Sequence, residues 1–280
     1  MVDSAYSLFE VFGTGRSVPA SYVPRENIDA RFLNYLSEDK HTVIHGPSGQ
    51  GKTMLIKRHL NAEQYRVVQC SNYHRRIDIY RMILGEADAS VSLETRIRKG
   101  KRLAATISFL SGGTESDSEI STKIIDIDLG NINDVIRALR ERDFDKYIVL
   151  EDFHYLRKKV QKEILNDLKI VSDKSGLRFI FIGIWLQKDK FLHLNGNLSG
   201  KINSIRVSPW TEPELRELIE TGESMLNVSF AKDVKAYLLS HSFGSVSILQ
   251  ELIYLTCNDL GILETRGQKL VVHPGNETES

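Results

Sequence analysis

Cysteine is scarce in this sequence, with only Cys70 and Cys257 among 280 residues. Two cysteines so far apart provide neither a disulfide framework nor the ligand spacing of a zinc site, and suit a reducing compartment. Long apolar runs are also missing, since the stretch 179–186 is far too short to cross a bilayer. The first residues lack the basic start and apolar run of a secretory signal. We therefore expect a soluble cytoplasmic protein with no membrane partner.

The sequence also has no excess of charge of either sign, because 37 Lys and Arg residues balance 37 Asp and Glu residues. Proteins that bind nucleic acid over a large surface usually carry a basic excess, since phosphate contacts supply most of their affinity. Any contact with DNA or RNA must therefore come from a local patch. The remaining composition, 41% hydrophobic and 26% charged, is that of an ordinary globular protein with one large or two modest domains.

Short apolar runs alternate with segments of helical period, which predicts βαβ units and a mainly parallel sheet. Five runs are interpreted as strands: 41–45, 66–70, 147–151, 178–183 and 204–208. Helices are expected from Lys52 onward and over 133–142 and 157–174. Beyond Pro209 the pattern is all-helical, beginning at Thr211 with Glu three residues later, followed by helices over 231–240 and 245–260.

The stretch between the first glycine-rich segment and the strand at Tyr147 is about 100 residues long, whereas a βαβ unit needs only about 30. Apolar flanks at 103–110 and 123–129 enclose a Gly- and Ser-rich segment, which predicts a β-hairpin inserted at about 95–130. The insertion begins with the basic run Arg96–Arg102. This run either contacts a DNA phosphate backbone or is a solvated helix end, and we favour the solvated end.

The segment Gly46-Pro47-Ser48-Gly49-Gln50-Gly51-Lys52-Thr53 matches G-x-x-x-x-G-K-[ST], after a β-like run and before a helical pattern. Glycines let successive backbone N–H groups face phosphate oxygens at the positive end of a helix. Lys52 would neutralise the β- and γ-phosphates and the Thr53 hydroxyl would ligate Mg²⁺, with Met54 next to them. The alternative, a chance glycine turn before a helix, is disfavoured by this context. The motif predicts a Mg-ATP site.

A second element places two acids at the end of an apolar strand, in Tyr147-Ile148-Val149-Leu150-Glu151-Asp152. Carboxylates in this position hold the Mg²⁺ shell and orient an attacking water. The alternative is an acidic strand end that faces solvent. Together with the glycine loop, the pair predicts that Glu151 and Asp152 are metal-binding and catalytic residues.

These motifs resemble an AAA+ or closely related STAND-type ATPase module over about residues 22–263. The resemblance rests on Gly46–Thr53, on Glu151 and Asp152, and on the entry to a helical lid at 208–215. The stretch Tyr22–Glu26 is also similar to the one that packs on adenine in origin-recognition-like members, and this implies nucleotide contacts for Val23 and Arg25.

The resemblance implies an α/β fold: a five-stranded parallel-sheet P-loop NTPase core, a small C-terminal helical lid and an inserted β-hairpin. It places an N-terminal linker at 1–25, the core at 26–209, the lid at 210–263 and a flexible tail at 264–280. Homo-oligomers or complexes with a partner protein are usual in such families. DNA is a further candidate client through the Arg96–Arg102 patch, although we favour a protein.

The sequence also departs from the AAA+ pattern. The acids stand in the order Glu-Asp rather than Asp-Glu, so we assign Glu151 to the metal shell and Asp152 to water activation. Only Gln187 is available as the polar sensor, and Lys201 with Arg206 stand where the family places its arginine finger. A Lys is a point charge and does not replace Arg freely. The helix start at 245–247 carries no sensing Arg.

The leading hypothesis is therefore a slow or partner-stimulated ATPase that acts as a switch or assembly motor in signalling, defence or mobile-element DNA processing. A nucleotide-binding scaffold with negligible hydrolysis is the alternative. A metabolic kinase is disfavoured, because no cluster for a phosphoryl acceptor is visible.

Overall fold

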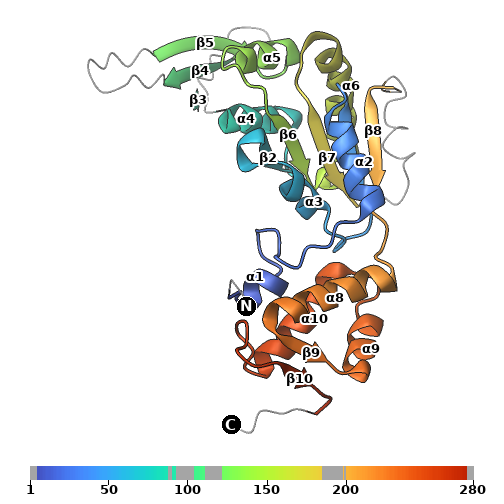
Figure 1. Cartoon of the computed structure of the whole chain (residues 1–280). Coiled ribbons are helices and arrows are strands. Elements are labelled where there is room, and N and C mark those ends of the chain that lie inside the picture. Colours follow the sequence, from blue (N-terminus) through green and yellow to red (C-terminus); the bar gives the residue numbers. More distant parts are fainter. Residues whose placement is uncertain are drawn as a thin grey trace. The chain divides into compact units, whose positions relative to one another are not determined.

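The computed structural model describes residues 5–87, 90–92, 104–110, 122–184, 198 and 200–275. The chain divides into two compact units. Their helices and strands are labelled in Figure 1, where the colours follow the sequence. Unit 1 comprises residues 1–34, 46–59 and 206–280, and unit 2 comprises residues 35–45 and 60–205. Each unit has a hydrophobic core of its own.

Unit 2 is built on a five-stranded sheet with the order β2-β6-β7-β1-β8. The pairs β2–β6, β6–β7 and β1–β7 are parallel, with Val67 opposite Val149 and Val43 opposite Phe181. The strands are β1 (His41–His45), β2 (Tyr65–Gln69), β6 (Tyr147–Glu151), β7 (Phe179–Gly183) and β8 (Ile202–Arg206). Every residue of β1 and β7 is buried, as expected for central strands of a parallel sheet.

Three helices pack with this sheet in the core of unit 2: α4 (Arg76–Glu86), α5 (Ile132–Arg140) and α6 (Lys158–Lys174). The apolar face that the sequence predicts for α6 is buried, namely Val160, Ile164, Leu168 and Val171. Two short 3-10 turns, η1 (Ala62–Gln64) and η2 (Phe153–Tyr155), precede β2 and follow β6. The predicted helix at 133–142 corresponds to α5.

The inserted hairpin is confirmed: β4 (Ala104–Leu110) and β5 (Thr122–Asp128) pair antiparallel with Ile107 opposite Ile125. A third strand that the sequence analysis did not expect, β3 (Ser90–Ser92), pairs with the outer side of β4. The basic run Arg96–Arg102 and the sensor candidate Gln187 lie outside the described residues.

Unit 1 contains six helices among its described residues: α1 (Leu8–Phe12), α2 (Glu26–Leu36, whose last two residues belong to unit 2), α3 (Lys52–His59), α8 (Glu212–Leu226), α9 (Lys232–His241) and α10 (Val246–Asp259). The predicted start of α8 is a capping box, in which Thr211 and Glu214 bond to one another. Helices α8, α9 and α10 form the predicted small helical lid.

Both ends of the chain contribute ordered elements to unit 1. Leu8, Val11 and Phe12 of α1 are buried in the same core as the lid helices. A side chain at Gly222 of α8 would collide with the ring of Phe12, so this contact requires glycine. At the other end, β10 (Leu270–Val272) pairs parallel with β9 (Val228–Phe230). The sequence analysis placed a linker and a flexible tail in these segments, because elements of three to five residues are too short to show a period.

The five predicted sheet strands are found within two residues of their predicted bounds, so the predicted fold class is confirmed. The largest shift is at β8, which ends at Arg206 rather than Ser208. Ser208 lies beyond the strand, where its carbonyl and hydroxyl oxygens accept hydrogen bonds from Arg25. Of the helices that the structure describes, none has the length and apolar character required to cross a membrane.

Candidate functional site

The glycine loop Gly46–Thr53 follows β1 and leads into α3. Gly46, Gly49 and Gly51 have φ angles of 149°, 71° and 80°, in the region that L side chains rarely adopt. A side chain at Gly46 would collide with the backbone carbonyl of Val207, and a Cβ at Gly49 would lie 2.5 Å from Ser245 Oγ. The loop conformation therefore requires glycine at these positions, as expected for a backbone that curls around an anion at a helix N-terminus.

Lys52 is the first residue of α3 and its side chain folds back over the loop. Its Nζ donates hydrogen bonds to the carbonyl oxygens of Gly46 at 3.1 Å and Pro47 at 2.6 Å. Thr53 and Met54 follow in the first turn of the helix and are half-buried. The positive charge of Lys52 thus lies on the loop that leads into α3, and a cation on a loop before a helix N-terminus suits a phosphate group.

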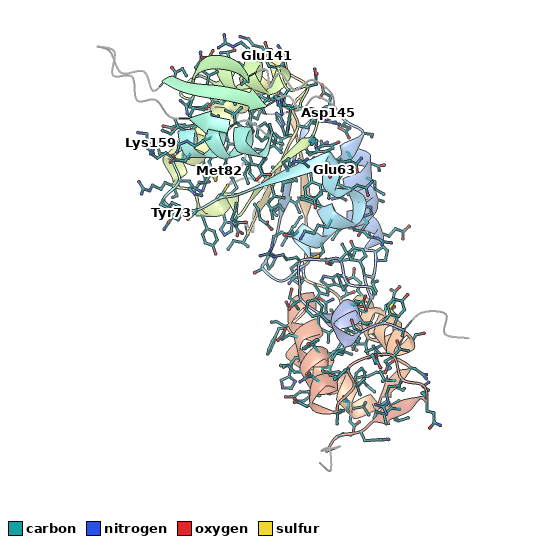
Figure 2. The ribbon with its side chains drawn as sticks, turned by 90° about the vertical axis from the view of Figure 1, so that its left-hand side faces the viewer. Glu63, Tyr73, Met82, Glu141, Asp145 and Lys159 are labelled. Carbon is teal, nitrogen blue, oxygen red and sulfur yellow. The ribbon has the colours of Figure 1, made fainter. Side chains whose placement is uncertain are left out.

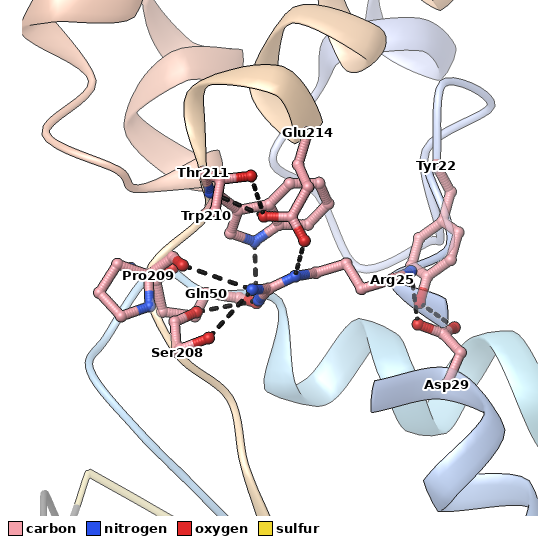
Figure 3. Close-up of polar contacts among 9 residues, drawn as sticks. All are labelled: Tyr22, Arg25, Asp29, Gln50, Ser208, Pro209, Trp210, Thr211 and Glu214. Atoms are coloured by element: carbon pink, nitrogen blue, oxygen red, sulfur yellow. Dashed lines mark hydrogen bonds and ion pairs between the residues drawn. The ribbon is translucent and has the colours of Figure 1, made fainter. Parts of the chain in front are cut away.

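The start of α10 and Trp210, two residues before α8, support the loop from within unit 1. The carbonyl oxygen of Gly49 accepts two hydrogen bonds, one from Ser245 Oγ and one from the backbone N–H of Ser247, each at 3.2 Å. Trp210 Nε1 donates to the carbonyl oxygen of Gln50 at 3.4 Å (Figure 3). Two consecutive loop carbonyls are therefore bonded to the helical lid.

Arg25 joins the segment before α2 to the segment that enters α8. Its side chain, 8% exposed, forms an ion pair with Glu214 at 3.0 Å and donates to the carbonyl oxygens of Ser208 and Pro209 (Figure 3). The guanidinium also lies 4.9 Å from the centre of the Trp210 ring. Although burial alone would raise the pKa of Glu214, the bonds from Thr211 and Arg25 lower it below its usual value. The predicted nucleotide contact Arg25 is thus held on Trp210, which supports the loop.

Asp29 of α2 fixes the residues around Arg25. Its carboxylate accepts from the Tyr22 hydroxyl at 2.8 Å and from the backbone N–H of Arg25 at 2.8 Å, and His59 Nε2 lies at 2.7 Å. Burial, together with Asp29, raises the pKa of Tyr22 well above its usual value. The phenol therefore remains protonated and donates to Asp29 across the whole working pH range.

A pocket of unit 1 opens beside the glycine loop and encloses about 520 Å³, its mouth included. Val23, Met54, Trp210, Leu218 and Val246 supply apolar surface, and Tyr22, Thr14 and Gln250 supply polar groups. Pockets of this kind, mostly apolar with a few polar groups, hold planar organic ligands. Because Gly51 also lines it, a ligand here would adjoin the phosphate cradle.

In unit 2, Glu151 is the last residue of β6, and Asp152 follows with a left-handed φ of 55°. The Asp152 carboxylate accepts from Gln69 Nε2 at 2.7 Å, and its other oxygen lies 4.0 Å from His154 Nδ1. Burial, with the charges of Asp152 and Glu151, raises the pKa of the nearby Cys70 thiol to about 12. Cys70 is therefore a neutral thiol beside two carboxylates.

Lys201 and Arg206 lie at opposite ends of β8. Lys201 precedes the strand, forms an ion pair with Asp173, and its carbonyl oxygen accepts from the N–H of His41 at the start of β1. It therefore lies at the amino edge of the sheet, whereas Glu151 ends a strand at the carboxyl edge. Arg206 is the exposed last residue of β8. The structure does not bring Lys201 together with the two acids.

The residues of the glycine loop fit an anionic nucleotide, because the loop is a glycine-dependent cradle with a cation and an adjoining apolar pocket. Within the described residues, no three His, Cys, Asp or Glu side chains converge as a ready metal cage. Mg²⁺ is usually held by one or two protein oxygens together with substrate phosphates. Thr53 in unit 1, and Glu151 and Asp152 in unit 2, each carry oxygen donors of that type.

Sequence reasoning missed the residues that support the site over long separations in the chain. Ser245 is 196 residues from Gly49, Trp210 is 160 from Gln50, and Gln69 is 83 from Asp152. The pocket residues Gly13 and Gly15 carried a faint signal, because two glycines flank Thr14 shortly before the adenine-type stretch at Tyr22. No local pattern distinguishes Ser245 or Gln69 from any other polar residue at an element boundary.

Comparison with known proteins supports this assignment of the fold. A family model described as an AAA domain matches residues 35–185. The structure is similar to Cdc6p of Pyrobaculum aerophilum, with a TM-score of 0.57, 14% identity, and coverage of 90% of this chain and 66% of that chain. It is similar to the Aeropyrum pernix ORC1 protein solved in complex with DNA, with a TM-score of 0.55, 14% identity and coverage of 91% and 64%.

A Walker-type ATPase of Pyrococcus abyssi is also similar, with a TM-score of 0.61, 13% identity and coverage of 90% of this chain and 72% of that chain. At such low identities the likeness shows the fold alone. The chain spans slightly less than two thirds of the length of the Cdc6p and ORC1 structures. No curated protein matches the sequence.

Proposed function

The chain belongs to the AAA domain family, and from this premise we propose that it is a Mg-ATP-dependent ATPase that works as a nucleotide-driven switch or assembly motor. The observation that carries the proposal is the pair of hydrogen bonds on the Gly49 carbonyl oxygen from Ser245 and Ser247. Any displacement of the loop on binding phosphate changes these bonds, and they belong to the first turn of α10. Nucleotide binding is thereby coupled to the helical lid.

ATP binding is assigned to unit 1. The backbone N–H groups of Gly46–Thr53 face the phosphates, and Lys52 exchanges its bonds to the Gly46 and Pro47 carbonyls for the β- and γ-phosphate oxygens. The base enters the apolar pocket and contacts Val23 and Met54. Arg25 acts by positioning Trp210, because its guanidinium is bonded to Ser208, Pro209 and Glu214.

Hydrolysis is assigned to the two acids of unit 2. A water attacks the γ-phosphorus, the bond from that phosphorus to the β,γ-bridging oxygen breaks, and ADP and phosphate leave. Asp152 accepts the proton of the water, and Thr53 and Glu151 are the residues that would hold Mg²⁺. When bound, Mg²⁺ neutralises the charge on the phosphates. Lys201, at the amino edge of its own sheet, is proposed to act on the site of a neighbouring copy, which assigns the chain to a homo-oligomer. Arg206, at the other end of β8, is proposed as a separate catalytic cation.

The client is proposed to be a DNA or a protein. The ORC1 protein of similar fold was solved in complex with DNA, which supports the first choice by analogy of fold. A nucleotide-binding scaffold with negligible hydrolysis is the second candidate function. It is favoured by one observation, that the Asp152 carboxylate is already bonded to Gln69 at 2.7 Å and must exchange this bond before it accepts a proton.

The proposal is tested by measuring ATP affinity and steady-state ATP hydrolysis of the purified chain and four variants. Lys52→Ala should weaken ATP binding about 10- to 100-fold, since it removes charged hydrogen bonds to phosphate. Asp152→Ala should keep ATP affinity and lower turnover by about a hundredfold or more. Lys57→Ala, in the last turn of the same helix, and Asp145→Ala, before the other end of β6, are the matched controls.

Turnover by Asp152→Ala equal to that of the wild type would disprove the role given to that acid. ATP affinity that is unchanged in Lys52→Ala would disprove the nucleotide site. Tight ATP binding with no turnover in any protein, with and without added double-stranded DNA, would favour the scaffold.

A further inference from the structure

Two tyrosine side chains of unit 2 are exposed close to the carboxyl edge of its sheet. Tyr73 follows β2 and is 70% exposed, and Tyr155 ends η2 after β6 and is 56% exposed. The segments that carry them touch, since Arg157 Nε donates to the carbonyl oxygen of Asn72 at 3.0 Å. Tyr combines an apolar ring with a polar hydroxyl and is enriched at binding interfaces, so two exposed rings on touching segments form a candidate binding surface.

Three cations follow Tyr155 closely in the chain. Arg157, Lys158 and Lys159 are consecutive and all exposed, and Tyr73 and Lys159 lie on the same side of unit 2 (Figure 2). Among the ion pairs of the described residues none involves Lys158 or Lys159. The nearby acids are engaged elsewhere: Asp78 pairs with Arg75, and Asp167 pairs with Arg76. The other opposing charges are Glu163, half-buried on α6, and Glu151 and Asp152 at the end of β6.

Helix stability does not account for the lysines. They occupy the first two positions of α6, whose first turn contains no acidic residue. Cations at that end are disfavoured by the helix dipole, so the pair costs α6 a few tenths of a kcal/mol. We name Tyr73, Tyr155, Arg157, Lys158 and Lys159 the tyrosine–lysine face.

We propose that the tyrosine–lysine face binds single-stranded nucleic acid. Bases stack on Tyr73 and Tyr155, and Arg157, Lys158 and Lys159 contact the phosphates. This combination of exposed aromatic rings with a basic surface is how proteins hold single strands without reading their sequence. A duplex keeps its bases stacked on one another and gains nothing from the two rings. The proposal deepens the proposed function by naming the class of client.

The face is also connected to the acid assigned to water activation. The Tyr155 ring contacts His154, with centroids 4.2 Å apart and the rings tilted by 37°, and His154 Nδ1 lies 4.0 Å from the Asp152 carboxylate. A base that stacks on Tyr155 is therefore two side chains away from Asp152. Strand binding should consequently alter turnover, and this second consequence rests on the proposed function.

The test is fluorescence anisotropy of labelled DNA and RNA single strands of about 20 nucleotides, longer than a site of about 4–16 nucleotides. Nucleotide is omitted, so the result does not depend on ATP binding or hydrolysis. Tyr155→Ala should weaken binding about 5- to 100-fold, the range expected for one base stack. Lys159→Glu should weaken it as well and reduce the dependence of the affinity on salt.

Matched controls are available in unit 1. Tyr237 is 58% exposed and stacks on His241 with centroids 3.9 Å apart, and Lys232 begins α9 as Lys158 begins α6. Tyr237→Ala and Lys232→Glu should leave strand binding unchanged. Equal affinity for the DNA and the RNA strand would show that the face recognises bases and phosphates, which both share. A preference for one would show whether the client is DNA or RNA. Either result supports binding of single strands by the tyrosine–lysine face.

Three results would overturn the inference. They are absence of binding to either strand at about 50 mM salt, equal losses in Tyr155→Ala and Tyr237→Ala, and equally tight binding of duplex that Tyr155→Ala does not affect. In a second experiment, ATP turnover is measured with and without the single strand. If the strand binds but does not change ATP turnover, the connection through His154 is disproved, whereas strand binding by the tyrosine–lysine face is not. Failure of ATP binding itself would instead disprove the proposed function.

Discussion

The glycine loop of unit 1 and the acids that follow β6 in unit 2 are held in different ways. The loop is fixed through its backbone, since the carbonyl oxygens of Gly49 and Gln50 accept bonds from α10 and from Trp210. Asp152 is held through its side chain, by one bond from Gln69, with 39% of that side chain exposed. We therefore expect changes near the loop to act on nucleotide binding and fold stability, and changes near Asp152 to act on turnover.

The largest expected effect is that of Gly46→Ala. Its φ of 149° is unfavourable for alanine, and the added methyl group collides with the backbone of Val207, so the loop must move. ATP binding should be lost, and the free energy of unfolding should fall by about 3 kcal/mol. Calorimetric titration with ATP and urea denaturation measure the two effects.

Gly51→Ala is the control for this prediction, because its φ of 80° is also left-handed but the nearest atom to the new methyl group is 3.9 Å away. It should cost only the backbone strain of about 1–2 kcal/mol. Equal costs for the two variants would show that the collision with Val207 is not what constrains the loop.

Removal of the Arg25 side chain should weaken the support of the loop. Arg25→Ala leaves Glu214 without its buried ion-pair partner and Trp210 without the cation on its ring, at a cost of about 3 kcal/mol. Arg25→Lys should recover only part of the lost free energy of unfolding. An ammonium group lacks the planar set of N–H donors with which the guanidinium bonds to Ser208, Pro209 and Glu214 together. Urea denaturation measures both, and full stability in Arg25→Lys would contradict this account.

The two units should respond to acid in different pH ranges. In unit 2, burial lowers the pKa of His41 from 6.5 to about 4, and its Nδ1 accepts from the N–H of Phe179. As the pH falls, His41 is therefore protonated in the unfolded chain before it is protonated in the folded one. Between pH 7.5 and 4.5 this difference should lower the free energy of unfolding by about 2.5 kcal/mol. In unit 1, the lowered pKa of Glu214 contributes stability that is lost only below about pH 4.5.

Urea denaturation at several pH values, with His41→Gln beside the wild type, measures the His41 contribution. The variant should be less stable at pH 7.5 and should lose less stability between pH 7.5 and 4.5 than the wild type. Parallel curves would show that His41 does not titrate in this window.

The smallest expected effect is that of Gln69→Ala. The variant removes the bond to Asp152 without touching unit 1, so ATP affinity should be unchanged and turnover should fall about tenfold, as for other residues that orient a ligand or base. Measurements of kcat and of ATP affinity separate the two effects. Turnover that rises instead would show that the bond restrains Asp152 in an inactive position.

Elements with a strong local pattern could be predicted from the sequence. The apolar run of β6, the capping box at Thr211 and the apolar face of α6 all appear where their patterns indicate. The short elements α1 and β10 could not be predicted, because their few apolar residues gain stability only from a core that the distant lid helices complete.

The candidate site divides in the same way. The glycine loop was predictable because its motif is local: a backbone that curls at a helix start needs glycine and a cation within eight residues. The support of that loop by Ser245 and Trp210 was not predictable, since both are more than 150 residues away.

The sequence by itself determined the family, the glycine loop and the acids after β6, because each depends on residues adjacent in the chain. Only the tertiary structure decided that the lid holds the loop by its carbonyls, that Gln69 holds Asp152, and that Lys201 lies at the other edge of the sheet. The physical reason is that hydrogen bonds over long separations depend on where whole elements pack, and no local pattern records that packing.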